Sequence, residues 1–422
     1  MREGGGTKHI GFISTRLAGT DGVSLETAKW AKIFESEGHL CFYMAGELDR
    51  PSQRSLLVKE AHFKHPAIRG IFNECFGNVR VRKPSTTKKI HQIKDKLKSE
   101  IYKFLRNFKI DILIPENALA IPLNIPLALA ITEVIAETGI STIAHHHDFF
   151  WERKRFLVNA VWDYLNMAFP PHLPSIQHVV INSSADNQLS LRTGISSTII
   201  PNVMDFDHPP RIDDYSSDIR ESLGLAQDEL LILQPTRVVK RKGIEHSIEL
   251  VKRLNMKAKL VVSHASGDEG YEYEQRVREY SSMMGVDTLF ICDIIKPYRG
   301  RTNDGRKIYT PQDIYARADL VTYPSNFEGF GNAFLEAIYF KKPIVVNNYS
   351  IYAVDIKPKG FKVIELDDYV NSEAVKLTRE VLTNPELIKQ MVDYNYELGK
   401  RYYSYSILKQ RLKVLLLNCF GM

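Results

Sequence analysis

Short apolar runs and amphipathic segments alternate along most of this chain. Runs of β-prone residues occur at 8–15, 40–45, 111–114, 141–144 and 179–181, and the rhythm restarts at 230–234, 259–264, 288–292 and 320–323. Between several of them, as at 126–137 and 244–254, apolar residues recur at helical spacing. Strands that alternate with helices are typical of parallel sheets covered by helices. The pattern predicts an α/β fold.

The length favours two domains. A chain of 422 residues exceeds one ordinary core, and domains of about 200 residues are the natural expectation. The Pro-containing, acidic segment 205–218 has the composition of a linker. We therefore predict an N-terminal domain over 1–204, a C-terminal domain over 205–400 and a final helix over 401–422.

The most informative stretch runs from Ala318 to Val346 and predicts a strand, a glycine loop, a helix and a second strand. Gly329 and Gly331 permit backbone angles that other residues resist, and Asn332 is the expected N-cap of the helix. A helix N-terminus behind a glycine loop presents free N–H groups to an anion, most often a phosphate.

Two carboxylates separated by seven residues, Glu328 and Glu336, give this stretch its character. One interpretation is an ordinary βα turn with a capping Glu and a surface Glu. The whole block Ser-Asn-Phe-Glu-Gly-Phe-Gly-Asn-Ala-Phe-Leu-Glu-Ala, however, resembles the signature of family 4 glycosyltransferases. These are retaining enzymes of GT-B fold that use nucleotide-sugar donors.

The resemblance implies two Rossmann-like domains facing a central cleft, with the C-terminal helix crossing back to the first domain. It implies that the first domain, 1–204, lies on the acceptor side and that the second, 205–400, binds the nucleotide sugar. It also assigns the donor site. Arg237 and Lys242, in an Arg, four residues, Lys, Gly pattern, are similar to the family's pyrophosphate-binding pair. The remaining implied donor contacts are the loop amides, a ribose-binding carboxylate and residues beside the base, namely Gly329, Phe330, Gly331, Asn332, Glu336, His264 and Ile295. Glu328 is expected to accept hydrogen bonds from donor-sugar hydroxyls.

A second block, His-His-His-Asp-Phe-Phe-Trp-Glu-Arg-Lys-Arg, follows the strand at 141–144. Strand neighbours point to alternate faces and no partner at metal-ligand spacing follows, so we expect no metal site and no divalent-metal requirement. In family 4 glycosyltransferases, which the chain resembles, a His followed by an acidic residue lies beside the donor sugar and the acceptor. His147 and Asp148 fit this role best, although the triplet leaves His145 and His146 open.

Further residues are candidates for the acceptor site. Gly22 lies in the first βα loop, where the family often has paired glycines, and Asp21 stands in place of the second one. A structural turn there is the alternative, before a helix that we expect Ser24 to cap. Asn117 follows the strand at 111–114. Arg153 and Arg155 either receive a carboxylate or phosphate of the acceptor or simply start a polar helix.

Charge is concentrated between Arg80 and Lys109, where eleven Lys or Arg residues face two acidic ones, against a net charge of +6 for the chain. Apolar residues at helical spacing predict an amphipathic helix with a basic outer face. That face is either merely solvated or docks on an anionic membrane or acidic acceptor.

Other sequence features indicate the cellular location of the protein. The stretch 113–135 is broken by prolines and polar residues and cannot span a bilayer as one helix, and the N-terminus lacks the apolar core of a secretory signal. The four cysteines are widely scattered, which suits a reducing compartment. We expect a cytoplasmic protein, with a peripheral position on the inner membrane face as the alternative.

The predicted function is retaining transfer of a hexose from a nucleotide sugar, the co-substrate, to an acceptor hydroxyl, with no other cofactor and no nucleic-acid partner. Overall resemblance favours GDP-mannose over a UDP-hexose. The expected acceptor is a small hydrophilic glycoside, and Arg153 to Arg155 suggest an acidic one such as a glucosylglycerate-type solute. A lipid-linked or envelope-glycan acceptor, a GT-B phosphorylase and a non-enzymatic nucleotide-sugar-binding protein are the alternatives.

Overall fold

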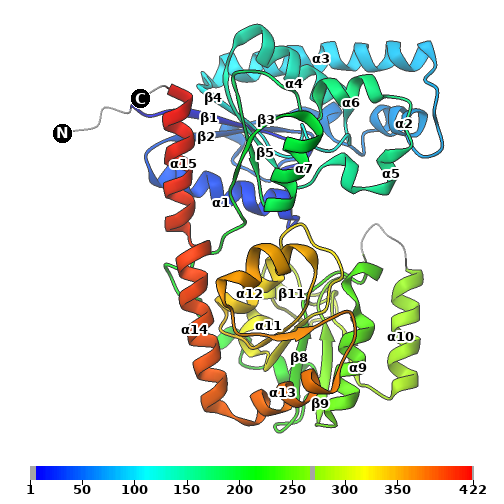
Figure 1. Cartoon of the computed structure of the whole chain (residues 1–422), viewed down its shortest axis with the longest axis vertical. Helices are drawn as coiled ribbons and strands as arrows, with labels where there is room; N and C mark the ends of the chain where they lie inside the picture. Colours follow the sequence, from blue (N-terminus) through cyan, green and yellow to red (C-terminus); the bar gives the residue numbers. More distant parts are fainter. Residues whose placement is uncertain (1–5, 267–270, 421–422) are drawn as a thin grey trace. The chain divides into compact units, whose positions relative to one another are not determined.

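The computed structural model describes residues 6–266 and 271–420 of the chain. It divides into two compact units (Figure 1). Unit 1 contains Met1–Asn202 together with Leu408–Met422, and unit 2 contains Val203–Ile407. Each unit is built on a parallel β-sheet packed against helices. The predicted α/β fold with two Rossmann-like units is confirmed.

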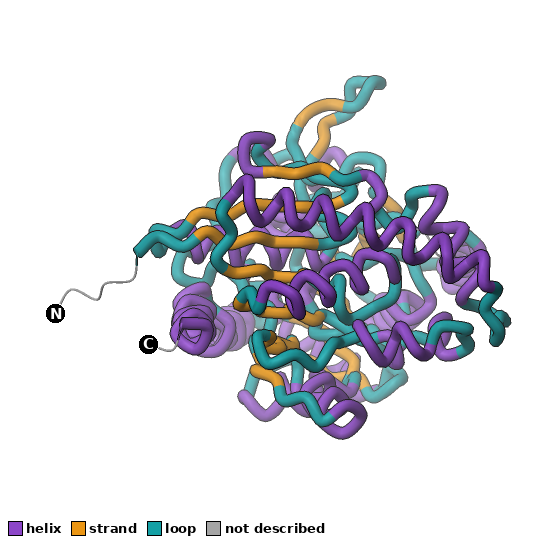
Figure 2. The backbone as a smooth tube through the Cα atoms, turned by 90° about the horizontal axis from the view of Figure 1, so that it is seen from above, coloured by secondary structure: helices purple, strands orange, loops and turns teal. Residues whose placement is uncertain are grey.

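Unit 1 contains, within the described residues, a seven-stranded sheet in the order β3-β2-β1-β4-β5-β6-β7. Every pairing in this sheet is parallel, and its strands lie side by side in the view from above (Figure 2). Parallel strands are buried on both faces, which is why they read as apolar runs in the sequence. The strands are β1 (His9–Ile13), β2 (Leu40–Ala45), β3 (Ser55–Leu57), β4 (Ile112–Pro115), β5 (Ser141–His146), β6 (Ile176–Val180) and β7 (Ser197–Ile199).

The helices of unit 1 cover this sheet with their apolar faces. In the basic helix α3, Ile90, Leu97, Ile101 and Phe104 recur at helical spacing and are fully buried. The helices of this unit are α1 (Gly22–Ser36), α2 (Pro66–Cys75), α3 (Pro84–Phe108), α4 (Ile125–Thr138), α5 (Lys154–Leu157), α6 (Trp162–Ala168) and α7 (Ser183–Thr193).

The C-terminal helix α15 (Tyr405–Phe420) belongs to unit 1 from Leu408 onward. Lys409 and Lys413 form ion pairs of 2.5 and 3.0 Å with Glu37, which ends helix α1. On the sheet side, the Gln177 amide donates to the Leu415 carbonyl at 2.9 Å. The C-terminal helix therefore packs within unit 1, from Leu408 onward.

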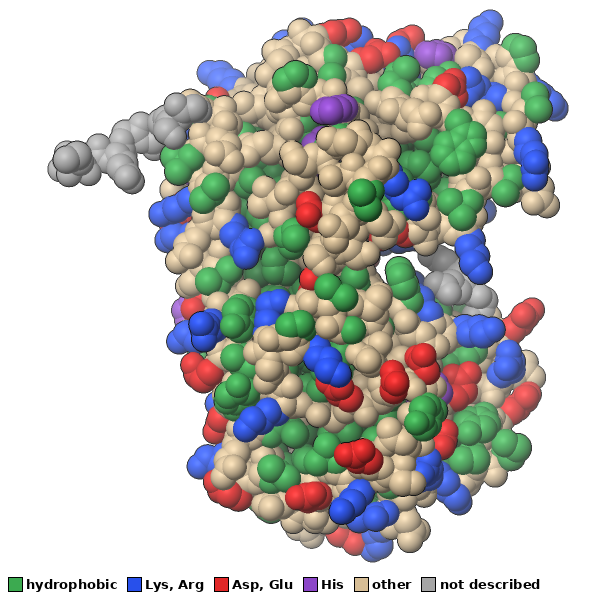
Figure 3. Space-filling model, in the orientation of Figure 1, with side chains coloured by type: hydrophobic (Ala, Val, Ile, Leu, Met, Phe, Trp, Pro, Cys, Tyr) green, Lys and Arg blue, Asp and Glu red, His purple; other side chains and the backbone are tan. Residues whose placement is uncertain are grey.

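Unit 2 repeats the Rossmann arrangement. Its six-stranded sheet, counted over the described residues, has the order β10-β9-β8-β13-β14-β15 with parallel pairings. Its strands are β8 (Leu230–Gln234), β9 (Ala258–Val262), β10 (Thr288–Phe290), β13 (Leu320–Tyr323), β14 (Ile344–Asn347) and β15 (Ile364–Leu366). Its helices are α8 (Ile219–Ser222), α9 (Ile244–Leu254), α10 (Glu272–Met284), α11 (Pro311–Arg317), α12 (Asn332–Tyr339), α13 (Ser372–Thr383) and α14 (Pro385–Tyr403). On the face of unit 2 shown in Figure 3, acidic and basic side chains are interspersed.

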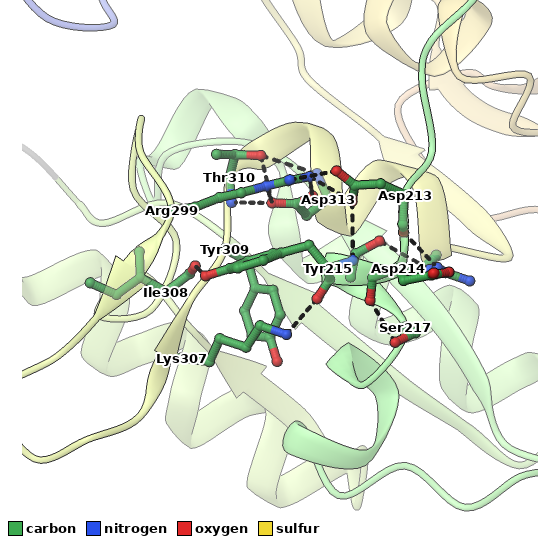
Figure 4. Close-up of polar contacts among 12 residues, drawn as sticks. Asp213, Asp214, Tyr215, Ser217, Arg299, Lys307, Ile308, Tyr309, Thr310 and Asp313 are labelled. Carbon is green, nitrogen blue, oxygen red and sulfur yellow. Dashed lines mark hydrogen bonds and ion pairs between the residues drawn. The ribbon is translucent and has the colours of Figure 1, made fainter.

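The polar segment 296–307 is not the open loop that its composition suggests. Residues 300–301 (β11) and 307–308 (β12) form an antiparallel pair. Arg299 fixes this hairpin with ion pairs to Asp213 at 2.6 Å and to Asp313 at 2.5 Å (Figure 4). The Tyr215 hydroxyl also donates to the Ile308 carbonyl at 2.9 Å. Charged and polar side chains hold this hairpin in place, so the spacing of apolar residues in the sequence did not predict it.

Candidate functional site

In unit 2, the loop after β8 and the loop after β13 are packed directly against each other. The first loop contains a short 3-10 turn, Lys240–Lys242, that ends at Gly243 with a φ of +57°. A Cβ atom at Gly243 would lie 2.5 Å from the Pro324 carbonyl oxygen, closer than real Cβ atoms approach. Only glycine permits this contact, which brings the basic loop beside the glycine loop.

The contact places Glu328 between two cations. The Glu328 carboxylate accepts a short hydrogen bond from Lys242 Nζ and another from Arg241 Nη1 at 3.1 Å. Lys242 and Glu328 are each only 8% exposed. Burial alone would raise the pKa of Glu328, but Lys242 and Arg241 outweigh burial and hold the pKa below its usual value. Glu328 is therefore an ionised carboxylate with fixed oxygen positions.

Helix α12 begins differently from the sequence-based expectation. The N-cap is Gly331, at a φ of +124°, and Asn332 is the first helical residue, so the prediction that Asn332 caps the helix was wrong. A hydrogen bond of 2.9 Å from the Tyr349 hydroxyl to the Phe330 carbonyl holds the glycine loop. Glu336 lies further along the helix beside Tyr315 and, after burial, contributes to raising the pKa of that phenol.

Three other predicted donor residues lie at the ends of neighbouring strands. Arg237 follows β8 and is exposed. His264 follows β9, and burial together with the charges of Lys242 and Arg237 lowers its pKa to about 4. Ile295 is buried and makes a backbone bridge to Tyr309. The carboxyl edge of this sheet thus gathers Arg237, Lys242 and His264.

In unit 1, the His triplet separates into two environments. His146 is buried, and its Nε2 lies 2.9 Å from Nδ1 of His178 on strand β6. His145 and His147 share the other side, as the alternation of a strand requires. His145 Nδ1 lies 2.9 Å and His147 Nε2 lies 3.4 Å from Oε2 of Glu116.

Glu116 was absent from the sequence-based candidates. It follows β4 directly, forms a parallel bridge with His145 and is fully buried. Burial would raise the pKa of Glu116, but the two imidazoles lower it below its usual value. Burial lowers the pKa of His145, whereas Glu116 outweighs burial at His147 and raises the pKa of that imidazole.

The histidines do have a carboxylate partner, although none follows them at metal-ligand spacing in the sequence, and the absence of a metal site stays a prediction. Glu116, His145 and His147 offer donor atoms that all lie within 4.8 Å of one another, and they form the group able to hold a metal ion among the residues that the structure describes. The partner comes from the neighbouring strand, so no spacing along the chain reveals it.

Asn117 positions the strand end that carries His147 and Asp148. Its backbone has a φ of +55°, which is uncommon for a residue other than glycine. The Asn117 side chain accepts a hydrogen bond from the His147 backbone N–H at 3.0 Å and donates one to Asp148 at 2.9 Å. Asp148 also accepts a short hydrogen bond from Arg153. Asn117 is 8% exposed, so the structure favours positioning over the predicted acceptor contact.

The first βα loop is organised by Asp21 rather than by Ser24. Asp21 is the N-cap of α1, and its carboxylate accepts from the Ser24 backbone N–H at 3.2 Å, so the prediction that Ser24 caps the helix was wrong. Arg16 forms an ion pair of 3.1 Å with the same carboxylate. Gly22 is the exposed first residue of the helix. Arg155 lies on α5 with its guanidinium carbon 4.7 Å from the Phe156 ring centre.

Acidic residues from neighbouring elements offset part of the positive charge of helix α3. Glu133 on α4 pairs with both Lys94 and Lys98 at 2.9 Å. Lys89 and Lys96 pair with Glu74 and Glu60 at 2.7 and 2.6 Å. These acidic partners neutralise much of the outer face that the sequence predicted to be basic. Among the described residues, moreover, no helix is both long and apolar enough to cross a bilayer.

Comparison with known proteins identifies the family. A family model described as glycosyl transferases group 1 matches residues 307–398, which include the glycine loop and α12. A mannosylglucosylglycerate synthase of Thermotoga maritima is 31% identical over 436 residues, covering 96% of this chain and 98% of that protein. The chain belongs to the group 1 glycosyltransferases. The predicted enzyme class is thus confirmed.

Two further matches extend this result. The glycosyltransferase is also 31% identical to a mannosylglucosylglycerate synthase of Petrotoga mobilis, over 85% of this chain and 86% of the relative. A crystal structure of Anabaena HepE in complex with UDP and glucose has a TM-score of 0.64 at 13% identity, covering 97% of this chain and 100% of that one. At this identity the structural match shows a shared fold.

Proposed function

We propose that this glycosyltransferase transfers a mannosyl residue from GDP-mannose to a hydroxyl group of a small acidic glycoside, with retention of configuration. Both mannosylglucosylglycerate synthases that it resembles are named for a product of mannosyl, glucosyl and glycerate parts. A glucosylglycerate is the acceptor that gives such a product by one mannosyl transfer.

The observation that carries the donor half of the proposal is the fixed carboxylate of Glu328. Lys242 and Arg241 hold it ionised, with its acceptor atoms beside the glycine loop. A carboxylate in this state accepts hydrogen bonds from sugar hydroxyls. Arg237 and Lys242 supply positive charge for the leaving diphosphate, a preorganised electrostatic contribution.

The remaining donor contacts follow from the same strand ends. The N–H groups of residues 329–332 precede α12 and suit the diphosphate oxygens. Glu336 binds the ribose hydroxyls, and His264 and Ile295 border the base. Guanine is the base that the proposal assigns, because the product names of the relatives contain mannose.

Unit 1 supplies the acceptor side. His147, with Asp148 beside it, assists at the reacting carbon and the acceptor hydroxyl, while Asn117 holds both residues in place. Gly22 lies at the acceptor loop, and Arg155 receives the acceptor carboxylate. Arg153 is paired with Asp148, so it acts on the acceptor through that residue.

No residue has to form a covalent intermediate in this proposal. The bond between the sugar C1 and the diphosphate oxygen breaks while the acceptor oxygen bonds to C1 on the same face. The acceptor proton passes to the departing phosphate oxygen, and GDP leaves. The protein contributes positioning and charge stabilisation.

The lipid-linked acceptor is the weaker candidate. This hypothesis rests on a basic surface along α3, but four of its lysines are paired with carboxylates, namely Lys89, Lys94, Lys96 and Lys98. Liposome binding at low and high salt tests it, because electrostatic docking must weaken with salt.

A transfer assay with matched substrates tests the proposal. GDP-mannose and UDP-glucose are each supplied with glucosylglycerate or with glucosylglycerol, which lacks the carboxylate, and products are identified by NMR. We expect an α-linked mannosyl product from GDP-mannose and glucosylglycerate, and much less from glucosylglycerol. A β-linked product would contradict retention. Release of a sugar 1-phosphate only when inorganic phosphate is present would show a phosphorylase instead.

A further inference from the structure

In the described part of unit 1, Glu116, His145 and His147 form a cluster of which the proposed transfer uses only His147. From it we infer that unit 1 binds a divalent transition-metal ion, of the Zn²⁺, Co²⁺ or Ni²⁺ class, through Glu116 Oε2, His145 Nδ1 and His147 Nε2. The inference rests on geometry, burial and ligand type. It does not depend on the proposed mannosyl transfer.

The distances from Glu116 to the two imidazoles are close to those around a small metal ion. Ligand atoms about 2.0–2.1 Å from a tetrahedral metal lie about 3.3 Å from one another. Glu116 Oε2 lies 3.4 Å from His147 Nε2 and 2.9 Å from His145 Nδ1. The two imidazole donors lie within 4.8 Å of each other, so a bound ion would draw the three ligand atoms together.

Burial and charge also favour a cation. Glu116 is fully buried and His145 is 1% exposed. Glu116 Oε1 and His145 Nε2 lack a hydrogen-bond partner among the described residues. A second buried carboxylate, Glu26, acts electrostatically on both imidazoles. Buried carboxylates are stabilised by a nearby cation, and a metal ion on Oε2 would supply one to Glu116.

Neighbouring residues hold the three ligands in place. Trp30 stacks on His145 with ring centres 4.2 Å apart. The Ser14 hydroxyl donates to the Glu116 carbonyl at 2.8 Å, and Asn117 fixes the backbone of both histidines. Surrounding hydrogen bonds and packing of this kind orient metal ligands.

The donor set indicates which ions fit. Mg²⁺ and Ca²⁺ prefer all-oxygen sites, whereas two imidazoles and one carboxylate suit Zn²⁺ and its neighbours. The His147 side chain is 10% exposed, and three protein ligands leave the fourth position of a tetrahedral ion open. Three protein ligands with a free position are typical of sites that bind water or a small oxygen ligand, rather than of purely structural sites.

The strand itself provides a matched control. His146 lies between the two ligands on the same strand, is also buried, and hydrogen-bonds to His178 on the other side. Replacing His146 therefore changes the same residue type in the same strand without touching the cluster.

The test uses untagged full-length protein, freed of metal by a chelator and titrated with CoCl₂ and with ZnCl₂. We expect one saturable Co²⁺ site with the visible absorption of tetrahedral coordination, and calorimetric Zn²⁺ binding. His147→Gln and Glu116→Gln should each weaken binding by about 100-fold or more, whereas His146→Gln should leave affinity unchanged. Thermal unfolding of each variant checks that it is folded, and His147→Gln keeps the test informative if Glu116→Gln is unstable.

Two outcomes would overturn the inference. The first is the absence of saturable binding to the wild-type protein, which would make the cluster a purely hydrogen-bonded one. The second is equal weakening by His146→Gln, or a thiolate-to-cobalt band that assigns the metal to cysteine. Neither readout requires turnover, so failure here is distinguishable from failure of the proposed transfer.

Discussion

Gly243→Ala tests how the two loops of the donor site are locked together. The added methyl would lie 2.5 Å from the Pro324 carbonyl oxygen and 3.1 Å from Cδ2 of His246. Pro324 begins the loop that carries Glu328, and Gly243 follows Lys242. The loops must therefore separate, which pulls the Lys242 ammonium away from the Glu328 carboxylate.

The magnitude follows from two contributions. Placing a residue with a Cβ in the left-handed region costs about 1–2 kcal/mol. Overpacking against a backbone atom that cannot rotate away costs about 1–3 kcal/mol more. Gly285→Ala is the control, because Gly285 has a φ of +63° but its nearest neighbour is Lys252 Nζ at 3.8 Å. The difference between the two variants should be about 1–3 kcal/mol.

The assay needs a probe that reports on unit 2. All three tryptophans, Trp30, Trp151 and Trp162, lie in unit 1. Denaturant unfolding should therefore be followed by far-UV circular dichroism, with tryptophan fluorescence as the internal reference for unit 1. We expect Gly243→Ala to lower the unit 2 transition more than Gly285→Ala and to weaken nucleotide binding, which Gly285→Ala should preserve. Equal stability and equal nucleotide affinity in the two variants would refute the packing argument.

Three further predictions concern other parts of the structure. Lys242→Met removes a buried partner of Glu328, so kcat for transfer should fall by about 10²–10³-fold in a steady-state assay. Asn117→Ala removes two side-chain hydrogen bonds of about 0.5–1.5 kcal/mol each, so kcat should fall while the donor KM changes little. Hydrogen bonding to Lys409 on α15 lowers the pKa of Glu37 below 4.5, so its stabilising effect is complete above pH 4.5 and is lost as pH falls through the lowered value. The tryptophan-monitored unfolding midpoint should then fall more steeply below pH 4.5 for the wild-type protein than for Glu37→Gln.

Each of these predictions has an outcome that contradicts it. Unchanged kcat in Lys242→Met would mean that the Glu328 carboxylate does not need its buried cation. Asn255 also has a left-handed backbone, with a φ of 51°. A loss of kcat in Asn255→Ala equal to that in Asn117→Ala would point to a general backbone effect. If the unfolding midpoints of the wild-type protein and Glu37→Gln fall equally with pH, Glu37 does not stabilise the packing of α15.

The strands were predictable where apolar runs are buried on both faces. The runs 40–45 and 230–234 coincide with β2 and β8, because central parallel strands leave an uninterrupted apolar signal. Strands β3 and β15 have three residues each and lie at sheet edges, where a pattern this short carries little information.

The candidate site was predictable only where the partners lie close in sequence or in a recurrent motif. Glu328 and Lys242 were both singled out, but their direct pairing depends on the Gly243 contact between two loops. Arg241 was missed because three consecutive cations, 240–242, do not show which side chain turns inward. Glu116 was missed because it reaches His145 across 29 residues through strand pairing.

We propose above all that unit 2 binds a guanine nucleotide through Glu336 and the glycine loop. The most direct measurement is calorimetric titration of GDP, UDP and ADP into the wild-type protein and Glu336→Ala, in parallel samples with chelator and with Mg²⁺. We expect saturable binding that is strongest for GDP, independent of Mg²⁺ and weakened by Glu336→Ala. Absence of nucleotide binding under both conditions, or GDP affinity unchanged in Glu336→Ala, would contradict it.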